Sequence, residues 1–316
     1  MEKQVRWGVL GNAWIARDFM IPAMADSAIC SLAAVASRSS VPAEIAPDAV
    51  HYDSYEKLLN DPDIDAIYVP VPNALHKQWS VKALQHGKHV LCEKPISCTA
   101  GEAEEMVRTA KENQVLLMEA FMYRYGGKFR KMMEILNSGV LGRIRALSGC
   151  HGYLLNWASP AREDPKLGGG SLYDVGCYVV DFMNAVAATQ GEKPVEGSAT
   201  FRMKGGVDWY CEGSVRYDGG ITGSLKCWFE SEQEQWVLIE GERGSLRIPD
   251  LFEGNGGELY LTVEGREQVI HVESENPYRL EAEVLSRAIL GIGDDTIPLE
   301  DSVTNMRTLD MLYGRG

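Results

Sequence analysis

Several features that mark other protein classes are absent from this sequence of 316 residues. Its seven cysteines form no Cys-x-x-Cys pair and have no histidine at ligand spacing, so we expect reduced thiols, no disulfide and no metal site. No apolar run approaches the roughly 18 residues that span a bilayer. The first residues also lack the basic stretch and cleavage site of a secretory signal, which predicts a cytoplasmic protein without a membrane partner.

Positive charge is also scarce in this chain. Lysine and arginine total 31, against 45 aspartate and glutamate residues, and the formal net charge is -14. Such a surface repels phosphate backbones, so a nucleic-acid partner is not expected. Hydrophobic residues at 45% and charged residues at 24% are typical of a globular protein, and the length favours two domains over one.

The first part of the chain alternates short apolar strands with helical segments. This alternation predicts an α/β fold, a doubly wound parallel sheet with helices on both faces. The expected strands are residues 4–10, 32–36, 50–52, 66–71, 89–92 and 115–118. The expected helices are residues 14–26, 54–59, 75–85 and 99–112.

The second part of the chain has a different character. One further helix is expected to end near residue 138, and hairpin signals follow at residues 205–206, 218–220 and 242–244. They predict an α+β domain over residues 122–316, built on a large, mainly antiparallel sheet. The runs ITGSLKCWF and WVLIE make one face of that sheet too apolar for solvent. We therefore expect a homodimer, or a dimer of dimers, formed through the sheet.

The turn after the first predicted strand carries a cofactor signal. Dinucleotide sites place the pyrophosphate at such a strand-to-helix turn. Their glycine motif appears here as Gly11-Asn12-Ala13-Trp14-Ile15-Ala16, with alanine at the middle glycine position. A turn without a ligand is the alternative interpretation. The surrounding strand-helix-strand pattern favours a Rossmann dinucleotide-binding domain over residues 1–121.

The end of the second predicted strand bears on the choice of cofactor. It carries Ser37 and Arg38, with no carboxylate before Glu44. NAD sites usually place an acidic residue near this point, whereas the 2′-phosphate of NADP needs a cation and hydroxyl donors. We expect NADP to be preferred over NAD, and NAD stays open.

Four segments, WGVLGNAWIA, VPNALH, GKHVLCEKP and GGGSLYDVGCY, resemble in order the signature segments of the glucose-fructose oxidoreductase, inositol dehydrogenase and MocA (Gfo/Idh/MocA) family. The likeness covers nearly the whole chain. The segment MEAFMYRY and the tyrosine at position 178 are most similar to the branch of NADP-dependent D-xylose dehydrogenases and dimeric dihydrodiol dehydrogenases. The resemblance implies hydride transfer between a nicotinamide and a carbinol or carbonyl carbon of a sugar or related cyclic hydroxyl compound.

Three residues would carry the chemistry that the resemblance implies. Tyr178 would exchange a proton with the substrate oxygen, and Lys94 would favour the phenolate form of Tyr178. Asp174 would accept a hydrogen bond from a substrate hydroxyl and help to hold Lys94. Asp174 and Tyr178 are expected on one face of a helix that starts near Ser171. The glycines at 168–170 are expected to clear space for the sugar and the nicotinamide.

Further residues are assigned by their place in these motifs. The expected cofactor-binding residues are Gly11, Asn12, Ala13, Trp14, Ile15, Ser37, Arg38, Pro72, Asn73, His76, Glu93 and Lys94. The expected substrate residues are His151, Trp157 and Tyr123. For His76, a histidine bonded only to backbone is the alternative. For Asp174 and Tyr178, the alternatives are a first-turn aspartate favoured by the helix dipole and a tyrosine of the core.

The sequence leaves several functional questions open. A catalytically silent sensor that binds NADP(H) and a glycosidase that retains its NAD are alternatives to a dehydrogenase. The joint presence of Lys94, Asp174 and Tyr178 favours the enzyme. Which of Tyr178 and Lys94 is the base, which substrate is used and which direction is physiological are not determined by the sequence.

Overall fold

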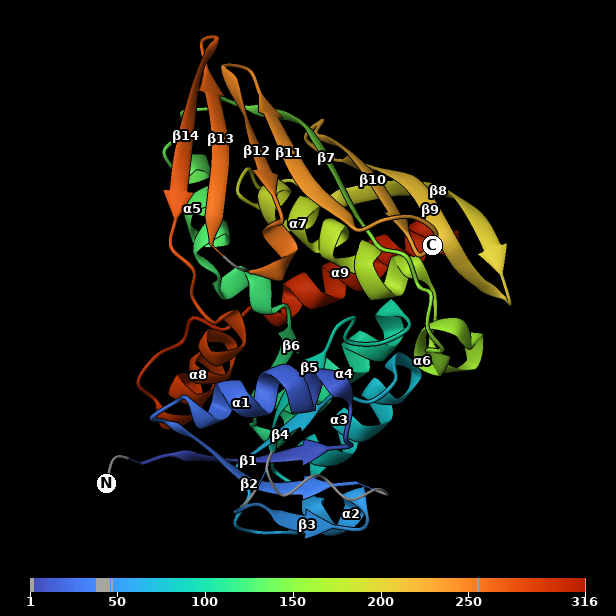
Figure 1. Cartoon of the computed structure of the whole chain (residues 1–316), viewed down its shortest axis with the longest axis vertical. Helices are drawn as coiled ribbons and strands as arrows, with labels where there is room; N and C mark the ends of the chain where they lie inside the picture. Colours follow the sequence, from blue (N-terminus) through green and yellow to red (C-terminus); the bar gives the residue numbers. More distant parts are fainter. Residues whose placement is uncertain (1–2, 38–45, 47, 255, 316) are drawn as a thin grey trace. The chain divides into compact units, whose positions relative to one another are not determined.

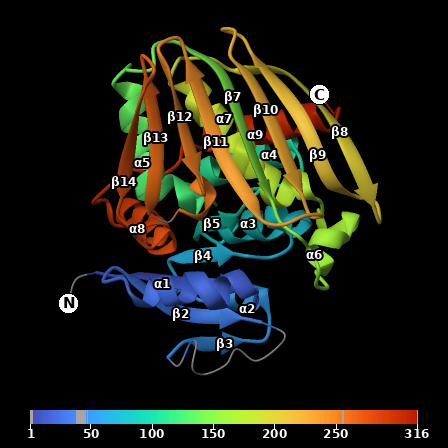
Figure 2. The same ribbon diagram turned by 45° about the horizontal axis from the view of Figure 1, so that its top comes forward.

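The structure is a computed structural model that describes residues 3–37, 46, 48–254 and 256–315. The chain forms two compact units. The first comprises Met1–Ser97, Gly101–Met122 and Tyr278–Ser302, and the second comprises Cys98–Ala100, Tyr123–Pro277 and Val303–Gly316. Figures 1 and 2 show the chain in two orientations.

A parallel sheet of six strands forms the centre of the first unit (Figure 1). Its strands are β1 (Val5–Leu10), β2 (Cys30–Ala36), β3 (Val50–Tyr52), β4 (Ala66–Val69), β5 (His89–Glu93) and β6 (Leu117–Ala120). The order is β3-β2-β1-β4-β5-β6, and each neighbouring pair is parallel. The predicted doubly wound sheet is confirmed. Sheets of this order bind ligands beyond the carboxyl ends of the strands, where the winding reverses between β1 and β4.

Short helices connect these strands. They are η1 (Ala16–Met20), α1 (Ile21–Ala25), α2 (Tyr55–Leu59), η2 (Asn73–Leu75), α3 (His76–Gln85) and α4 (Ala100–Asn113). Ser54 caps the start of α2, since its hydroxyl accepts a hydrogen bond from the Lys57 backbone N–H at 3.2 Å. Gly87, with φ of 71°, follows the end of α3 as expected for a left-handed terminal residue. Among the described residues, no helix is long and apolar enough to cross a membrane.

Helix α8 (Pro277–Leu290) belongs largely to the first unit, whereas the sequence assigned all of 122–316 to the second. Its Ser286 hydroxyl accepts a hydrogen bond from Trp7 Nε1 at 3.2 Å and lies 3.2 Å from the Cys30 thiol. Trp7 and Cys30 are core residues of β1 and β2. The chain therefore returns to its first sheet after completing the second.

The second unit is built on an eight-stranded sheet (Figure 2). Its strands are β7 (Ile144–Gly152), β8 (Pro194–Lys204), β9 (Val207–Tyr217), β10 (Thr222–Trp228), β11 (Glu234–Gly241), β12 (Gly244–Pro249), β13 (Gly257–Val263) and β14 (Arg266–Val272). The order is β14-β13-β12-β11-β7-β10-β9-β8, and only β7 and β10 pair in parallel. This confirms the large, mainly antiparallel sheet and its three predicted hairpins.

The central strand β7 was not predicted from the sequence. Its segment IRALSGCHG contains two glycines and no regular apolar alternation, so it resembles a loop. The glycines have a packing reason. A Cβ at Gly149 would lie 3.1 Å from Val179 of the neighbouring helix, and a Cβ at Gly152 would collide with the ring of Trp228. Close packing, rather than strand propensity, therefore determines these positions.

One face of the eight-stranded sheet is covered by helices, as the two views show (Figures 1 and 2). The helical segments of the second unit are η3 (Met122–Tyr125), α5 (Gly127–Asn137), α6 (Pro160–Glu163), η4 (Pro165–Leu167), η5 (Leu172–Gly176), α7 (Cys177–Ala188), η6 (Leu251–Glu253) and most of α9 (Leu299–Leu312). Helices α5, α7 and α9 lie on one face. No described helix covers the other face.

Candidate active site

The turn between β1 and η1 lies at the strand end where parallel sheets of this order place a dinucleotide. Gly11 has φ of 102°, and its backbone N–H donates to the Ala36 carbonyl at 2.7 Å. A Cβ at this position would lie 3.0 Å from the Tyr55 hydroxyl, so a side chain would be both strained and crowded. Trp14, three residues later, is 47% exposed. These residues fit a group that approaches the backbone closely at the carboxyl end of β1.

The remaining predicted cofactor residues of the first unit lie at the ends of neighbouring strands. Ser37 follows β2 and is buried, and its backbone N–H donates to Tyr52. Pro72 and Asn73 follow β4. Arg38, on which the preference for NADP was based, lies outside the described residues.

His76 is fully buried between two strand ends. Its Nε2 lies 2.7 Å from the Val71 carbonyl oxygen, and its Nδ1 lies 2.8 Å from the Pro95 carbonyl oxygen. Burial, with a smaller contribution from Lys94, lowers the pKa of His76 to about 4, although both carbonyls favour the charged ring. A neutral ring donates from only one nitrogen. Both of these contacts of the His76 ring are to backbone carbonyls, as in the alternative interpretation of this residue from the sequence.

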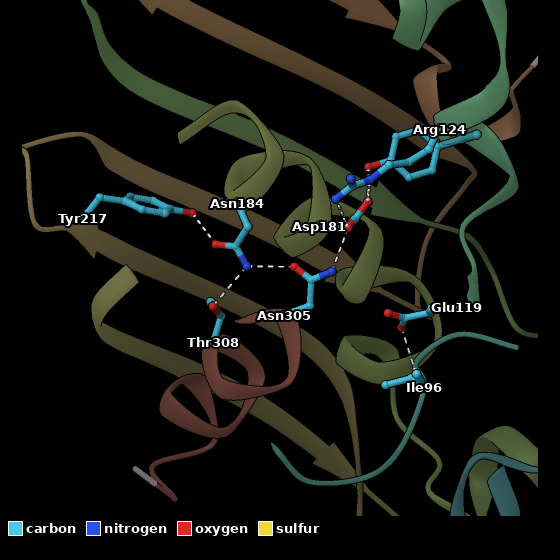
Figure 3. A network of polar contacts seen from close by, with 9 residues as sticks. Ile96, Glu119, Arg124, Asp181, Asn184, Tyr217, Asn305 and Thr308 are labelled. Atoms are coloured by element: carbon cyan, nitrogen blue, oxygen red, sulfur yellow. Dashed lines mark hydrogen bonds and ion pairs between the residues drawn. The ribbon is translucent and has the colours of Figure 1, made fainter. Parts of the chain in front are cut away.

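Glu93 is the last residue of β5, and Lys94 follows it. Tyr68 donates to Glu93 Oε1 at 2.5 Å, and burial together with this carboxylate raises the pKa of the Tyr68 phenol. Two further contacts fix the segment after Lys94. The Pro95 carbonyl meets His76, and the Ile96 N–H donates to Glu119 Oε1 at 2.8 Å (Figure 3). The backbone that follows Lys94 is therefore held by two buried side chains of the first unit, His76 and Glu119.

Asp174 lies in η5, a short π-helical turn that precedes α7. The predicted helix start near Ser171 is present, but the wider turn separates Asp174 and Tyr178 by a different rotation than four α-helical residues would. Asp174 Oδ2 accepts hydrogen bonds from the Tyr153 hydroxyl at 2.6 Å and from Arg162 Nε at 2.9 Å. Two side chains donate hydrogen bonds to this carboxylate, so they stabilise its charge in addition to the dipole of the first helical turn.

Tyr178 lies in an aromatic cluster at the start of α7 and is 8% exposed. Its ring centroid is 5.4 Å from His151, 5.6 Å from Phe252 and 5.8 Å from Tyr123. His151 also stacks on Phe252 at 5.3 Å. The second unit thus brings two of the three predicted substrate residues, His151 and Tyr123, against the predicted proton carrier. The third, Trp157, is 52% exposed and stacks on Tyr153, the partner of Asp174.

The structure gives two of the glycines at 168–170 a packing reason of their own. A Cβ at Gly169 would lie 2.4 Å from the Arg162 carbonyl oxygen, and one at Gly170 would lie 2.2 Å from the Asp208 carboxylate. Gly168 and Gly170 have φ of 77° and 121°. Within the second unit, a side chain at Gly169 would displace the segment that carries Arg162, and one at Gly170 would displace the Asp208 carboxylate.

A buried ion pair anchors α7 one turn after Tyr178. Asp181 is fully buried and accepts hydrogen bonds from Tyr123, from two nitrogens of Arg124 and from Asn305, at 2.5–2.9 Å (Figure 3). Asn184 extends the network to Asn305, Thr308 and Tyr217. The Tyr123 hydroxyl belongs to this network, and the Tyr123 ring contacts that of Tyr178.

Sequence reasoning did not identify Tyr153, Arg162, Phe252 or Asp181. Isolated arginines and aromatics carry no motif, and Asp181 differs from an ordinary helix residue only by its burial. A cavity of about 400 Å³ adjoins the same part of the second unit, lined by Ala158, Ser159, Pro160, Glu163, Asp164, Pro165 and Gly205. Asp174 and Tyr178 do not line it. Within the described part of the chain, no three His, Cys, Asp or Glu side chains gather as a metal site requires.

Comparison with known proteins agrees with this architecture. The sequence profile of the GFO/IDH/MocA oxidoreductase family, described as having an NAD-binding Rossmann fold, matches residues 5–121. The profile of the GFO/IDH/MocA C-terminal domain matches residues 129–247.

Individual relatives extend the match along the chain. The chain is 33% identical to D-xylose 1-dehydrogenase (NADP(+)) 2 of Haloferax volcanii, over 97% of this chain and 96% of the relative. It is 32% identical to trans-1,2-dihydrobenzene-1,2-diol dehydrogenase of Mus musculus, over 78% and 75%. A 3-ketoreductase from Actinomadura kijaniata, solved with NADP and TDP-benzene, superimposes with a TM-score of 0.87 at 25% identity, over 99% and 98%.

The fold is shared more widely. Aldose-aldose oxidoreductase from Caulobacter crescentus, solved with glycerol, superimposes with a TM-score of 0.89 at 23% identity, over 99% of this chain and 97% of that one. Both family profiles, the full-length relative and the two sheets lead to one conclusion. The chain belongs to the GFO/IDH/MocA family and is an NAD(P)-dependent oxidoreductase of the sugar-dehydrogenase type.

Proposed function

We propose that this protein is an NADP-preferring dehydrogenase of aldoses or related cyclic hydroxyl compounds. The observation that carries the proposal is the full-length similarity to an NADP(+)-dependent D-xylose dehydrogenase. The diol dehydrogenase relatives make cyclic dihydrodiols the second substrate class to test. NAD remains the alternative cofactor because Arg38 lies outside the described residues.

The first unit would hold the dinucleotide. Gly11, Asn12, Ala13, Trp14 and Ile15 would cradle its pyrophosphate at the end of β1. The other proposed binding residues follow β2, β4 and β5, and they are Ser37, Arg38, Pro72, Asn73, His76, Glu93 and Lys94. When bound, the nicotinamide supplies or accepts the hydride at its C4 atom. Within this set, His76 would act by holding the segments that follow β4 and β5, through its contacts with the Val71 and Pro95 carbonyls.

Lys94, Asp174 and Tyr178 are the proposed catalytic residues. In the direction of alcohol oxidation, the hydroxyl proton of the substrate passes to Tyr178 or Lys94 as the hydride leaves the carbinol carbon. The ammonium group of Lys94 would stabilise a phenolate at Tyr178 and donate to the reacting oxygen. Asp174 would accept a hydrogen bond from a neighbouring substrate hydroxyl. The rings of His151, Tyr123 and Trp157 would border the sugar.

A panel of substrates and cofactors tests this proposal. Aldoses, inositols and dihydrodiols would each be offered with NADP+ and with NAD+, and the absorbance of the reduced cofactor would be followed. We expect turnover of an aldose or a dihydrodiol, faster with NADP+. Tight NADPH binding without turnover would instead identify a sensor, and release of a leaving group without net cofactor change would identify a glycosidase.

We further propose that two copies associate through the uncovered face of the eight-stranded sheet. Strand pairing places Ser198, Ser214, Ser224 and Ser148 side by side across four strands of that face. The reason differs from the expected one. Leu225, Cys227, Val237 and Ile239 from the apolar runs are buried, because they lie on the helix-covered face. A row of small side chains on a sheet face allows close approach of a second sheet.

Two further predictions from the sequence stay untested. Division into folding domains at residue 121 needs limited proteolysis. A cytoplasmic location needs fractionation of cells.

A further inference from the structure

Two donors converge on one oxygen of Asp174. The Tyr153 hydroxyl and Arg162 Nε both donate to Oδ2, at 2.6 Å and 2.9 Å. The side chains of Arg162 and Asp174 are only 21% and 15% exposed. Hydrogen bonds to a charged acceptor are stronger than neutral ones, and limited exposure reduces their screening. The plane of this carboxylate is therefore determined by two other side chains.

Arg162 is itself held by the glycine segment. The Gly170 N–H donates to the Arg162 carbonyl at 3.0 Å, and Gly169 leaves no room for a side chain against that carbonyl. Arg162 Nη1 donates to the Ser159 hydroxyl at 3.1 Å, and the Ser159 N–H donates to Glu163 at 2.8 Å. Arg162 thus lies on a short helical turn that is held by hydrogen bonds at both ends. These bonds fix the position of its guanidinium group beside Asp174.

Tyr153 is fixed from the other side. Its ring stacks on Trp157 at 5.7 Å and contacts Phe229 at 5.2 Å, and its backbone N–H donates to Trp228 at 3.0 Å. Burial, and then the nearby Asp174 charge, raise the pKa of the Tyr153 phenol, so the hydroxyl stays protonated and available as a donor. The Asp174 charge likewise raises the pKa of Arg162, which stays cationic.

We propose that Tyr153 and Arg162 are positioning residues that orient the Asp174 carboxylate toward a substrate hydroxyl. This inference rests on the proposed function, because it gives Asp174 a substrate to bind. It assigns a reason to the glycine segment, which seats Arg162 against Asp174. It also predicts that Tyr153 and Arg162 affect sugar binding through Asp174 and not by their own contact with the sugar.

The experiment uses the full chain with D-xylose and NADP+ as the probe pair. Tyr153→Phe removes one hydroxyl, and we expect kcat/KM for D-xylose to fall about tenfold, with a rise in KM. Arg162→Met should cost more, and Arg162→Lys should recover part of that loss because it keeps the charge without the planar fork. Arg145→Met is the matched control, since it also removes an arginine from an ion pair. Arg145 lies in β7 and pairs with Glu242 at an exposed position of the eight-stranded sheet. This variant should leave kcat/KM unchanged.

An Asp174→Asn background decides whether the effect passes through the carboxylate. Tyr153→Phe should cost much less there than in the wild type, because coupled residues are not additive. Equal fold-losses in both backgrounds would overturn the inference. If Arg162→Met does not fold, the Tyr153→Phe cycle still decides, because that variant removes a single oxygen atom.

A second readout separates this inference from the proposed function. The rise in Tm that D-xylose causes in each variant reports binding without turnover. The inference expects the rise to shrink in Tyr153→Phe only when Asp174 is present, and an unchanged rise would contradict it. A wild-type protein that turns over no compound in the panel would contradict the proposed function instead.

Discussion

The imidazole of His76 joins the ends of two neighbouring strands, which is a structural task that a motif alone does not reveal. Both ring nitrogens lie within 2.8 Å of backbone carbonyls, at Val71 and Pro95. The Pro95 contact adjoins Lys94, so a change in the ring would disturb the backbone that carries a proposed catalytic residue. His76 is in this sense a positioning residue of the strand ends.

The charge of His76 should appear in the pH dependence of stability. Its pKa is about 4 in the folded protein against 6.5 ordinarily, so the unfolded chain binds more protons between these values. The stabilisation is complete above pH 6.5 and is lost as the pH falls toward 4, by about 3 kcal/mol. Urea unfolding of wild type and His76→Asn from pH 7 to 4.5 measures it. The difference between the two proteins should shrink on acidification, and a constant difference would contradict the neutral buried ring.

The buried carboxyl group of Glu281 gives stability the opposite pH dependence to that of His76. Both of its carboxyl oxygens are buried without a hydrogen-bond partner among the described residues, and burial raises the pKa of this group well above its ordinary value. The folded state therefore retains a proton that the unfolded chain releases, and this costs stability as the pH rises above about 4.5.

Glu281→Met should stabilise the protein at pH 7 by about 1–3 kcal/mol. The substitution removes a buried carboxyl group without a hydrogen-bond partner in the described part of the chain and replaces it with an apolar side chain of similar length. The gain should diminish near pH 4.5, where the carboxyl stays protonated in the folded protein and is about half protonated in the unfolded chain. Chemical denaturation at the two pH values measures the gain. A destabilised variant at pH 7 would show that Glu281 makes a contact that the described residues do not contain.

At the scale of elements, α7 is positioned by a charge pair as well as by apolar packing. Asp181 and Arg124 have side-chain exposures of 0% and 9%. Removing one partner of such a pair leaves the other charge buried and uncompensated. The same pair holds the Tyr123 ring against Tyr178.

Asp181→Ala should therefore lower the free energy of unfolding by about 3–5 kcal/mol. Lys131→Ala, which removes an exposed ion pair on α5, is the control and should change stability little. Thermal and urea unfolding measure both variants. A loss in Asp181→Ala no larger than in the control would mean that the network does not stabilise α7.

The elements also show which parts of the fold were predictable. Most strands of the first sheet have short apolar runs and clear turn residues, and the structure places all six within a few residues of their expected bounds. Strand β7 escaped prediction because packing against α7 requires glycine where a strand would favour branched residues. In the candidate site, motif residues were identifiable, but Tyr153 and Arg162 were not, because their importance lies in a contact across the fold.

At the scale of the whole molecule, one face of the eight-stranded sheet is not covered by any described helix, and we propose that a second chain covers it. Its central row of serines lies on β8, β9, β10 and β7, while the opposite side chains are buried. The net charge of -14 opposes association, so a dimer would need close contact of the two faces to overcome repulsion.

Light scattering at micromolar concentration should give twice the mass of one chain. Ser224→Arg places a long charged side chain in the middle of the row and should shift the protein to a monomer with an unchanged far-UV spectrum. Ser138→Arg, at the end of α5, is a control that should remain dimeric. A monomeric wild type, or a dimeric Ser224→Arg variant, would contradict association through this face.

The most direct test of the proposed chemistry is single-turnover oxidation of D-xylose with NADP+ by the Tyr178→Phe variant. The proposal predicts a hydride-transfer rate at least about 100-fold below that of the wild type, with NADPH affinity retained. A wild-type rate in Tyr178→Phe would contradict the assignment of Tyr178 as a proton-transferring residue.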